Sequence, residues 1–260
     1  MSSAAESLST LVGLIGRGGV RVVDLTQPLD ESTPVISLPP EVGKNSPAFS
    51  KTPVSNFDAD GPGWAWYALS MGEHCGTHFD SPNHWHTGRE HETGGPATIP
   101  PENFIASACV IDVSAKAAAD PDYLLTIDDV TAFEAEHGRI EDGALVLMRT
   151  DWSKRTEPGA FLNDGHCPGP SVEVMKFLAE ERQTRGFGVE QVGTDAGLAG
   201  MFDPPFPAHH YMHMKNRYGL ASLTNLDQLP PKGAVVIAAP LKIVGGSGSP
   251  LRVLALTPAD

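Results

Sequence analysis

The sequence predicts a single α/β domain in which helices flank a mixed β-sheet. After residue 105, segments with helical periodicity alternate with short β-branched segments, an alternation that is typical of α/β folds. The first hundred residues contain mainly strand and loop signals, so we expect a mixed sheet. The chain has 260 residues and no Ser/Gly linker or charge run, which favours one domain over residues 1–260.

The first element is an amphipathic helix over 4–16. Leu8, Leu11, Val12 and Ile15 form one apolar stripe, and Gly18 and Gly19 end the helix. A terminal helix with one stripe has to bury it. We therefore expect residues 1–18 to dock either on the core of the same chain or, as we favour, on a partner subunit.

A strand over 20–25 is followed by a long segment, 32–63, that is rich in proline and glycine. A loop of this length in a compact domain is typical of a lid or a binding loop, although simple surface wrapping is the alternative. A strand over 64–69 then leads to the most informative motif. Trp64 and Trp66 share one face of that strand, so they either line a flat pocket or fill the core.

The remaining elements alternate along the chain. Thr126, with Asp129 three residues later, predicts an N-cap for a helix over 127–137 that ends at Gly138. Ser171 opens a second helix with an apolar face formed by Val174, Met175, Leu178 and Ala179. We expect a further helix over 209–217, and strands over 107–113, 144–148, 187–193, 220–224, 234–238 and 251–256.

The amino-acid composition limits the classes of partner that we expect. Lys and Arg number 18 against 32 Asp and Glu, which gives a net charge of −14 and argues against nucleic acid or an anionic membrane surface. Three cysteines at irregular spacing predict no disulfide framework and suit a reducing cytoplasm. No run of 18 apolar residues is present, so we expect neither a signal peptide nor a membrane span.

Residues 74–84 carry the chemistry. His74, His78, Asp80 and His84 lie within eleven residues, and Gly76 and Pro82 between them disfavour a regular helix. We therefore expect a folded loop that wraps a divalent cation. Glu73, next to the first histidine, is expected to orient a histidine through its free ring nitrogen, and 245–248 is expected to form a turn.

Two imidazoles and one carboxylate leave coordination positions open for water and substrate, as in a catalytic site. His74, His78 and Asp80 are thus the predicted metal ligands. His84 is the predicted general base, because a neutral imidazole can accept the proton of an activated water near pH 7. The alternatives are a structural metal module, or a chance cluster in a chain with ten histidines.

The motif His74-Cys-Gly-Thr-His78-Phe-Asp80-Ser-Pro-Asn-His84 resembles the His-x-Gly-Thr-His-x-Asp-x-Pro-x-His signature of the cyclase family, which includes bacterial kynurenine formamidases and isatin hydrolases. The likeness extends to residues 24–26, 149–152, 193–195 and 225–230. It implies a metal-dependent amidohydrolase with a mixed α/β fold, usually dimeric or larger. It also implies that the first two histidines and the aspartate bind zinc or manganese, and that His84 is catalytic.

One departure from the family pattern concerns a second metal. In the two-zinc formamidases a downstream histidine and a glutamate complete that site; His209 matches the histidine, but Ala221 occupies the glutamate position. We therefore expect one divalent metal per chain, with Mn²⁺ favoured and Zn²⁺ the alternative. The pattern resembles the isatin hydrolase branch, in which His209 and Ser222 would form a proton relay. His213 is a candidate substitute ligand.

Aromatic residues near the motif suggest the substrate. Phe79 and Trp85 flank it, and Trp64, Trp66 and Trp152 are further candidates for walls around a planar ring. The expected reaction is hydrolysis of the carbon–nitrogen bond of a small aromatic cyclic amide such as isatin. The alternatives are an arylformamidase acting on N-formylkynurenine, a γ-lactamase, and, from a different class, a catalytically inactive small-molecule binding protein.

Overall fold

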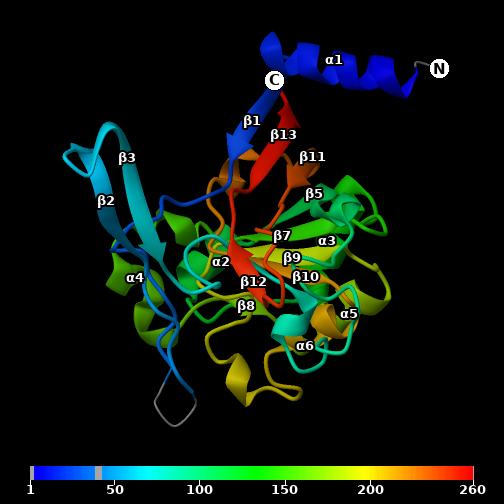
Figure 1. Cartoon of the computed structure of the whole chain (residues 1–260). Helices are drawn as coiled ribbons and strands as arrows, with labels where there is room; N and C mark the ends of the chain where they lie inside the picture. The colour runs from blue at the N-terminus through cyan, green and yellow to red at the C-terminus, as the bar shows by residue number, and fades with distance from the viewer. Residues whose placement is uncertain (1–2, 39–42, 260) are drawn as a thin grey trace.

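A nine-stranded mixed sheet forms the centre of the described chain in a computed structural model, which describes residues 3–38 and 43–259 (Figure 1). The strands β5, β7, β9 and β10 run parallel to one another, and antiparallel strands continue the sheet on both sides. The predicted α/β fold with a mixed sheet is confirmed. In sheet order the strands are β1 (Val20–Asp24), β13 (Leu254–Pro258), β11 (Lys232–Ile237), β5 (Ile105–Asp112), β7 (Leu145–Arg149), β9 (Gly186–Val189), β10 (Tyr218–Ala221), β4 (His78–Asp80) and β12 (Gly248–Pro250).

The central strands are buried on both faces, and their alternate side chains supply two separate cores. Leu145 and Leu147 of β7 pack with Val23 and Leu25 on one face of the sheet. Val146 and other side chains of opposite parity pack on the other face, under a helical layer of α3 (Ile127–His137), α5 (Val172–Glu180) and α6 (Pro207–Met214). Because side chains alternate across a strand, one apolar run can serve both layers.

The two helices with strong end signals are confirmed. Thr126 and Asp129 form the reciprocal capping box of α3, and Gly138 follows its last turn with a φ of 82°. Ser171 accepts a hydrogen bond from the amide of Val174 at the start of α5, whose predicted apolar face is buried. Helix α6 begins two residues earlier than predicted and ends at Met214, before Asn216 adopts a left-handed φ of 57°.

Several short elements were not anticipated. They are α2 (Ser114–Ala119), α4 (Pro158–Leu162), β6 (Leu124–Leu125), β8 (Gly169–Pro170) and β12. Strand boundaries also shift: the strand predicted over 220–224 is β10, which ends at Ala221 because Ser222 has a left-handed φ of 54°. The strand predicted over 187–193 ends at Val189, and that predicted over 251–256 begins at Leu254.

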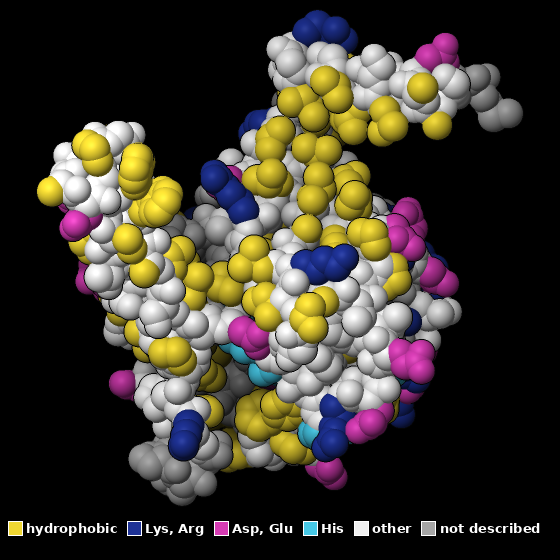
Figure 2. All heavy atoms as spheres, in the orientation of Figure 1, with side chains coloured by type: hydrophobic (Ala, Val, Ile, Leu, Met, Phe, Trp, Pro, Cys, Tyr) yellow, Lys and Arg dark blue, Asp and Glu magenta, His cyan; other side chains and the backbone are white. Residues whose placement is uncertain are grey.

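The N-terminal helix α1 (Ala4–Gly16) lies apart from the body and joins it through β1 (Figure 1). Ser3 and Glu6 form its capping box, and none of its residues is buried. Leu8 and Val12 are 66% and 70% exposed. Figure 2 shows hydrophobic side chains along the side of α1 that faces the body. Docking on the core of the same chain, one of the two expectations, is therefore wrong.

A β-hairpin of β2 (Ser50–Asp58) and β3 (Gly61–Ser70) projects from the body next to the sheet. The expectation of loop structure over 32–63 is thus wrong from residue 50 onward. Pro53 stands inside β2, which is tolerated because this two-stranded hairpin leaves one edge of the strand unpaired. The rings of Trp64 and Trp66 lie 5.6 Å apart on β3 and are exposed, so they do not fill the core.

Cys75, Cys109 and Cys167 are free and buried. Within the described ranges, no helix has both the length and the apolar character needed to cross a membrane.

An ion pair between α3 and the segment that follows α5 makes stability depend on pH. Glu134 of α3 receives two hydrogen bonds from Arg182, at 2.6 and 2.8 Å, and one from the amide of Ile140. The Arg182 hydrogen bonds lower the pKa of Glu134 below its ordinary value of 4.5. The unfolded chain then binds more protons in the acid range, so this stabilisation is present above about pH 5 and is lost as pH falls through the folded pKa.

We expect Glu134→Gln to reduce the free energy of unfolding by about 1.5–3 kcal/mol at pH 7, because Arg182 loses a charged acceptor. The deficit should shrink as the pH falls below about 5. Urea denaturation across this pH range measures it, with Glu136→Gln, at a side chain that is 78% exposed, as the control. A deficit that is constant with pH would contradict the ion-pair origin.

Candidate metal centre and active site

The motif over 74–84 lies at the junction of β4 with two neighbouring strands. β4 pairs with β10 on one side and with β12 on the other, and Asp80 stands opposite Gly219 and Gly248. The expected folded loop is therefore wrong for His78–Asp80, which form a strand, while the absence of a regular α-helix is confirmed in the motif. In a strand, side chains two residues apart share a face, so His78 and Asp80 point the same way.

The three predicted metal ligands converge. Their candidate ligand atoms all lie within 4.8 Å of one another. Nδ1 of His74 is 2.8 Å and Nε2 of His78 is 3.3 Å from Oδ1 of Asp80. Gly76 makes the return of the chain possible, because it adopts a left-handed φ of 62° between the two histidines. Two imidazoles and one carboxylate are a donor set that Zn²⁺ and Mn²⁺ accept, so these residues fit a divalent cation.

Charge and hydrogen bonds prepare this group for a cation. Burial opposes the ionisation of Asp80, yet His78 and His74 hold the pKa of its carboxyl well below the usual range. Burial also opposes a charge on His78, but Asp80 outweighs it and raises the pKa of His78. Nδ1 of His78 lies 2.8 Å from the carbonyl of Gly76, which can only accept, so Nδ1 carries a hydrogen and Nε2 is the atom left to bind a cation.

His84 is the last residue of a 3₁₀ turn, Pro82–His84, and its ring packs beside the ring of His74. Its ring centroid is 4.0 Å from that of His74, at an interplanar angle of 35°. Burial lowers the pKa of His84 to about 3, so the ring is neutral at pH 7. In the part of the chain that the structure describes, neither ring nitrogen has a hydrogen-bond partner, so a lone pair is free to accept a proton.

His209 of α6 stands on the other side of Asp80. Its Nε2 is 3.8 Å from Oδ2 of Asp80, and its ring centroid is 5.5 Å from that of His84. Nδ1 of His209 lies 2.5 Å from the carboxylate of Asp195, which also accepts the amide of Ala208. Burial favours a neutral ring, but Asp195 and Asp80 together raise the pKa of His209. Asp195 thus orients His209. The sequence signal for this role is that Asp195 follows the buried strand β9, because functional residues gather beyond the carboxyl ends of parallel strands.

Ala221 and Ser222 lie at the end of β10. Ala221 stands opposite His78 in the β10–β4 register and is buried in the core, so its methyl group offers no ligand atom for a second cation. The hydroxyl of Ser222 is 3.4 Å from the carbonyl of Gln191. Among the described residues no hydrogen bond joins Ser222 to His209, so their relay stays a prediction.

His213, the candidate substitute ligand, is 1% exposed and lies in the same histidine cluster. Its ring centroid is 5.4 Å from that of His209 and 6.2 Å from that of His84. Nδ1 binds the carbonyl of Arg217, and Nε2 has no partner in the described chain. The candidate metal group in that part of the chain does not include it.

Of the aromatic residues that we expected to contact substrate, some lie at the site and others are buried in the core. The ring centroid of Trp85 lies 4.8 Å from that of His209 and 5.4 Å from that of Phe206. No sequence signal had marked Phe206 as a site residue. Phe79, expected to contact substrate, is instead wholly buried and stacks on Tyr218, because it alternates with His78 and Asp80 across β4. Trp152 is also in the core.

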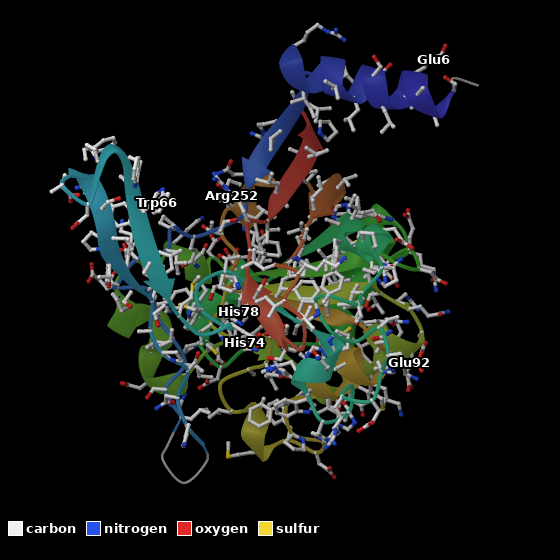
Figure 3. All side chains as sticks on the ribbon, viewed as in Figure 1. Glu6, Trp66, His74, His78, Glu92 and Arg252 are labelled. Atoms are coloured by element: carbon white, nitrogen blue, oxygen red, sulfur yellow. The ribbon has the colours of Figure 1, made fainter. Side chains whose placement is uncertain are left out.

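Trp64 and Trp66 lie outside the site of their own chain. Figure 3 places Trp66 on the projecting hairpin, well away from His74 and His78. Their expected role as walls of the pocket therefore does not hold within one chain. Figure 2 shows histidine side chains at the rim of a hollow between the hairpin base and the body.

Known proteins are similar to this chain in sequence and in fold. The family model named Cyclase matches residues 23–196. An isatin hydrolase from Roseibium aggregatum is 49% identical over 261 residues, covering 98% of this chain and 99% of that protein. A kynurenine formamidase from Salinibacter ruber is 31% identical over 191 residues, covering 72% of this chain and 77% of that protein.

The solved structures agree with the sequence matches. A crystal structure of an isatin hydrolase bound to the product analogue thioisatinate has a TM-score of 0.97 at 49% identity, covering 99% of this chain and 100% of that one. The family match spans more than half of the chain, and the metal group and His84 are the very residues that carry the motif. This chain therefore belongs to the cyclase family.

Proposed function

We propose that this protein hydrolyses the carbon–nitrogen bond of a small aromatic cyclic amide of the isatin class, using one divalent cation held by His74, His78 and Asp80. The observation that carries the proposal is the convergence of these three donors beside the neutral His84. The near full-length similarity to isatin hydrolases supports the substrate class.

The residues around the metal group suit hydrolysis. When bound, the cation would supply Lewis acidity that lowers the pKa of a water molecule and polarises the amide carbonyl. His84 accepts the proton of the attacking water through its free lone pair and returns it to the departing nitrogen. His209, oriented by Asp195, lies on the far side of Asp80. We propose, from the family resemblance alone, that His209 and Ser222 form a proton relay.

A single metal ion distinguishes this proposal from its nearest alternative. A second cation would need an anionic ligand where Ala221 stands, directly opposite His78. We propose Mn²⁺ as the ion, with Zn²⁺ as the alternative. Two zinc ions per chain would instead favour an arylformamidase.

Trp85 is the aromatic wall that we propose for the substrate. It packs against both His209 and Phe206, and its indole Nε1 has no hydrogen-bond partner within the described residues. An aromatic substrate stacked on this ring would gain about 0.5–1.5 kcal/mol beyond area burial.

We further propose that the chain works as a homodimer or a larger homo-oligomer in which α1 docks on a second copy. The helix presents an apolar stripe that its own chain leaves exposed, and the hairpin adds Trp64, Trp66 and Leu69 as exposed apolar side chains. Monomeric proteins rarely expose apolar patches of this extent.

Isatin turnover tests the proposed reaction. Protein stripped of metal and then supplied with Mn²⁺ should remove isatin, followed by the loss of its absorbance, and a strong chelator should abolish the activity because the donor group loses its cation. If metal-replete protein leaves isatin unchanged but cleaves N-formylkynurenine, the substrate proposal is wrong while the chemistry stands.

Replacement of His84 tests the assignment of the base. We expect His84→Ala to bind Mn²⁺ with unchanged stoichiometry, measured by elemental analysis, and to lose about 10²–10⁴-fold in kcat, because the proton acceptor is gone. His86→Ala, at an exposed neighbouring histidine, is the matched control and should keep full activity. Equal turnover by both variants would contradict the role of His84, and a lack of turnover by the wild type would favour a binding protein.

The oligomer is tested on the helix. Leu8→Glu combined with Val12→Glu places two charges in the apolar stripe of α1, and we expect a shift to monomer in light scattering coupled to size-exclusion chromatography. Ser9→Glu combined with Thr10→Glu, at exposed positions on the side of the same helix away from that stripe, is the control. A wild-type protein that is already monomeric would contradict the proposed homo-oligomer.

A further inference from the structure

The segment Gly246–Gly248 lies directly against the first metal-ligand candidate, although the sequence suggested only a turn. A Cβ atom on Gly248 would lie 2.6 Å from Cε1 of His74, and one on Gly246 would lie 2.7 Å from Oε1 of Glu73. Real Cβ atoms do not approach so closely. The position of Gly248 therefore requires glycine, because a Cβ there would also lie 2.2 Å from the backbone oxygen of Phe79, whereas a side chain at Gly246 would displace the Glu73 carboxylate.

Ser247, between these glycines, joins Glu73 to the His74 ring. Its hydroxyl oxygen is 3.1 Å from Nε2 of His74 and 2.7 Å from Oε2 of Glu73. The amide of Ser247 donates to the same carboxylate oxygen at 3.1 Å. Glu73 thus holds both polar groups of the serine, and the serine reaches the nitrogen of His74 that faces away from Asp80.

The hydrogen bonds in this chain of contacts match the form of His74 that can bind a cation. A serine hydroxyl has one proton, and a carboxylate oxygen accepts. When that proton is donated to Glu73, the hydroxyl oxygen accepts from Nε2–H of His74. A cation would use the lone pair of Nδ1, the atom 2.8 Å from Oδ1 of Asp80 in the candidate metal group, so the hydrogen of the cation-bound ring lies on Nε2, where Ser247 accepts it.

The opposite tautomer would block the site. If Ser247 were free to donate to Nε2, Nδ1 would carry the hydrogen and bond to Asp80, which would remove one metal-ligand atom and occupy another. Outer hydrogen bonds that fix the tautomer of a ligating histidine are worth 10–100-fold in metal affinity. His78 has its own fixing contact, the carbonyl of Gly76, so each histidine of the group is held from behind.

We propose that Glu73 and Ser247 are positioning residues that hold His74 by its Nε2–H, and so favour the tautomer that binds the cation through Nδ1. The proposal rests on the metal site proposed above. It differs from a merely structural role, in which Glu73 would only tie the Gly246–Gly248 segment to the motif, because it predicts a protected hydrogen on Nε2 of His74 when the cation is bound.

Metal affinity is the first test. Glu73→Ala should raise the Kd for Mn²⁺ about 10–100-fold in titration calorimetry, because Ser247 is freed to donate to His74. Glu73→Gln should stay close to wild type, since its amide oxygen can accept both serine donors. Glu92→Ala removes an exposed carboxylate away from the site and serves as the control (Figure 3). Equal affinity of the Glu73→Ala and Glu92→Ala proteins would overturn the inference.

The nitrogens of His74 give a second readout. In protein loaded with Zn²⁺ and labelled with ¹⁵N-histidine, wild type should show a hydrogen on Nε2 of His74 that exchanges slowly with solvent, and Glu73→Ala should speed that exchange because Ser247 is no longer held as the acceptor. Ser247→Ala, which removes the link itself, should also weaken Mn²⁺ binding, and it remains informative if Glu73→Ala fails to fold. An Nε2 hydrogen that exchanges equally slowly in Glu73→Ala would overturn the inference. A wild type that binds neither metal would instead overturn the proposed function.

Discussion

The buried carboxylate of Asp80 is the constraint on which the rest of the site depends. It is 2% exposed, and removing a charge from water costs several kcal/mol unless partners offset that cost. The sheet supplies these partners by pairing β4 with strands on both sides, which brings His74, His78 and His209 around one carboxylate. A site that concentrates nitrogen donors around a buried anion favours a positive charge at its centre.

The remaining architecture keeps this arrangement rigid. The parallel strands end at the same edge of the sheet, so the segments after β9 and β10 deliver Asp195 and Ser222 close to the motif. Close backbone approach completes the packing, because Gly219 and Gly248 stand opposite Asp80 on its two neighbouring strands. Side chains at these positions would push the strands apart, and the ligands would lose their common geometry.

Two elements that project from the domain, α1 and the β2–β3 hairpin, differ from the core in how they treat apolar side chains. Helix α1 and the β2–β3 hairpin each expose apolar side chains, and neither packs them against its own chain. Their stability in isolation is limited, because a short helix and a two-stranded hairpin gain most of their stability from tertiary contacts. A second copy that covers them would explain why apolar residues persist there, and it would give Trp64 and Trp66 a use that one chain does not provide.

Local signals in the sequence determined much of the molecule. The spacing of His74, His78, Asp80 and His84 identified the candidate site, and the caps at Thr126 and Ser171 fixed the starts of two helices, because these depend on residues only a few positions apart. Glu73 was also suspected from its place beside His74.

Only the tertiary structure decided the rest. The strand pairing that buries Phe79, the contacts of Asp195 and Phe206 near the site, and the link from Glu73 through Ser247 all join segments distant in sequence. The hairpin was missed for a related reason, because its prolines and glycines are typical of loops and only cross-strand pairing stabilises the strands. Periodicity and capping report on neighbours along the chain, whereas a site is made by neighbours in space, and sheet topology alone determines which those are.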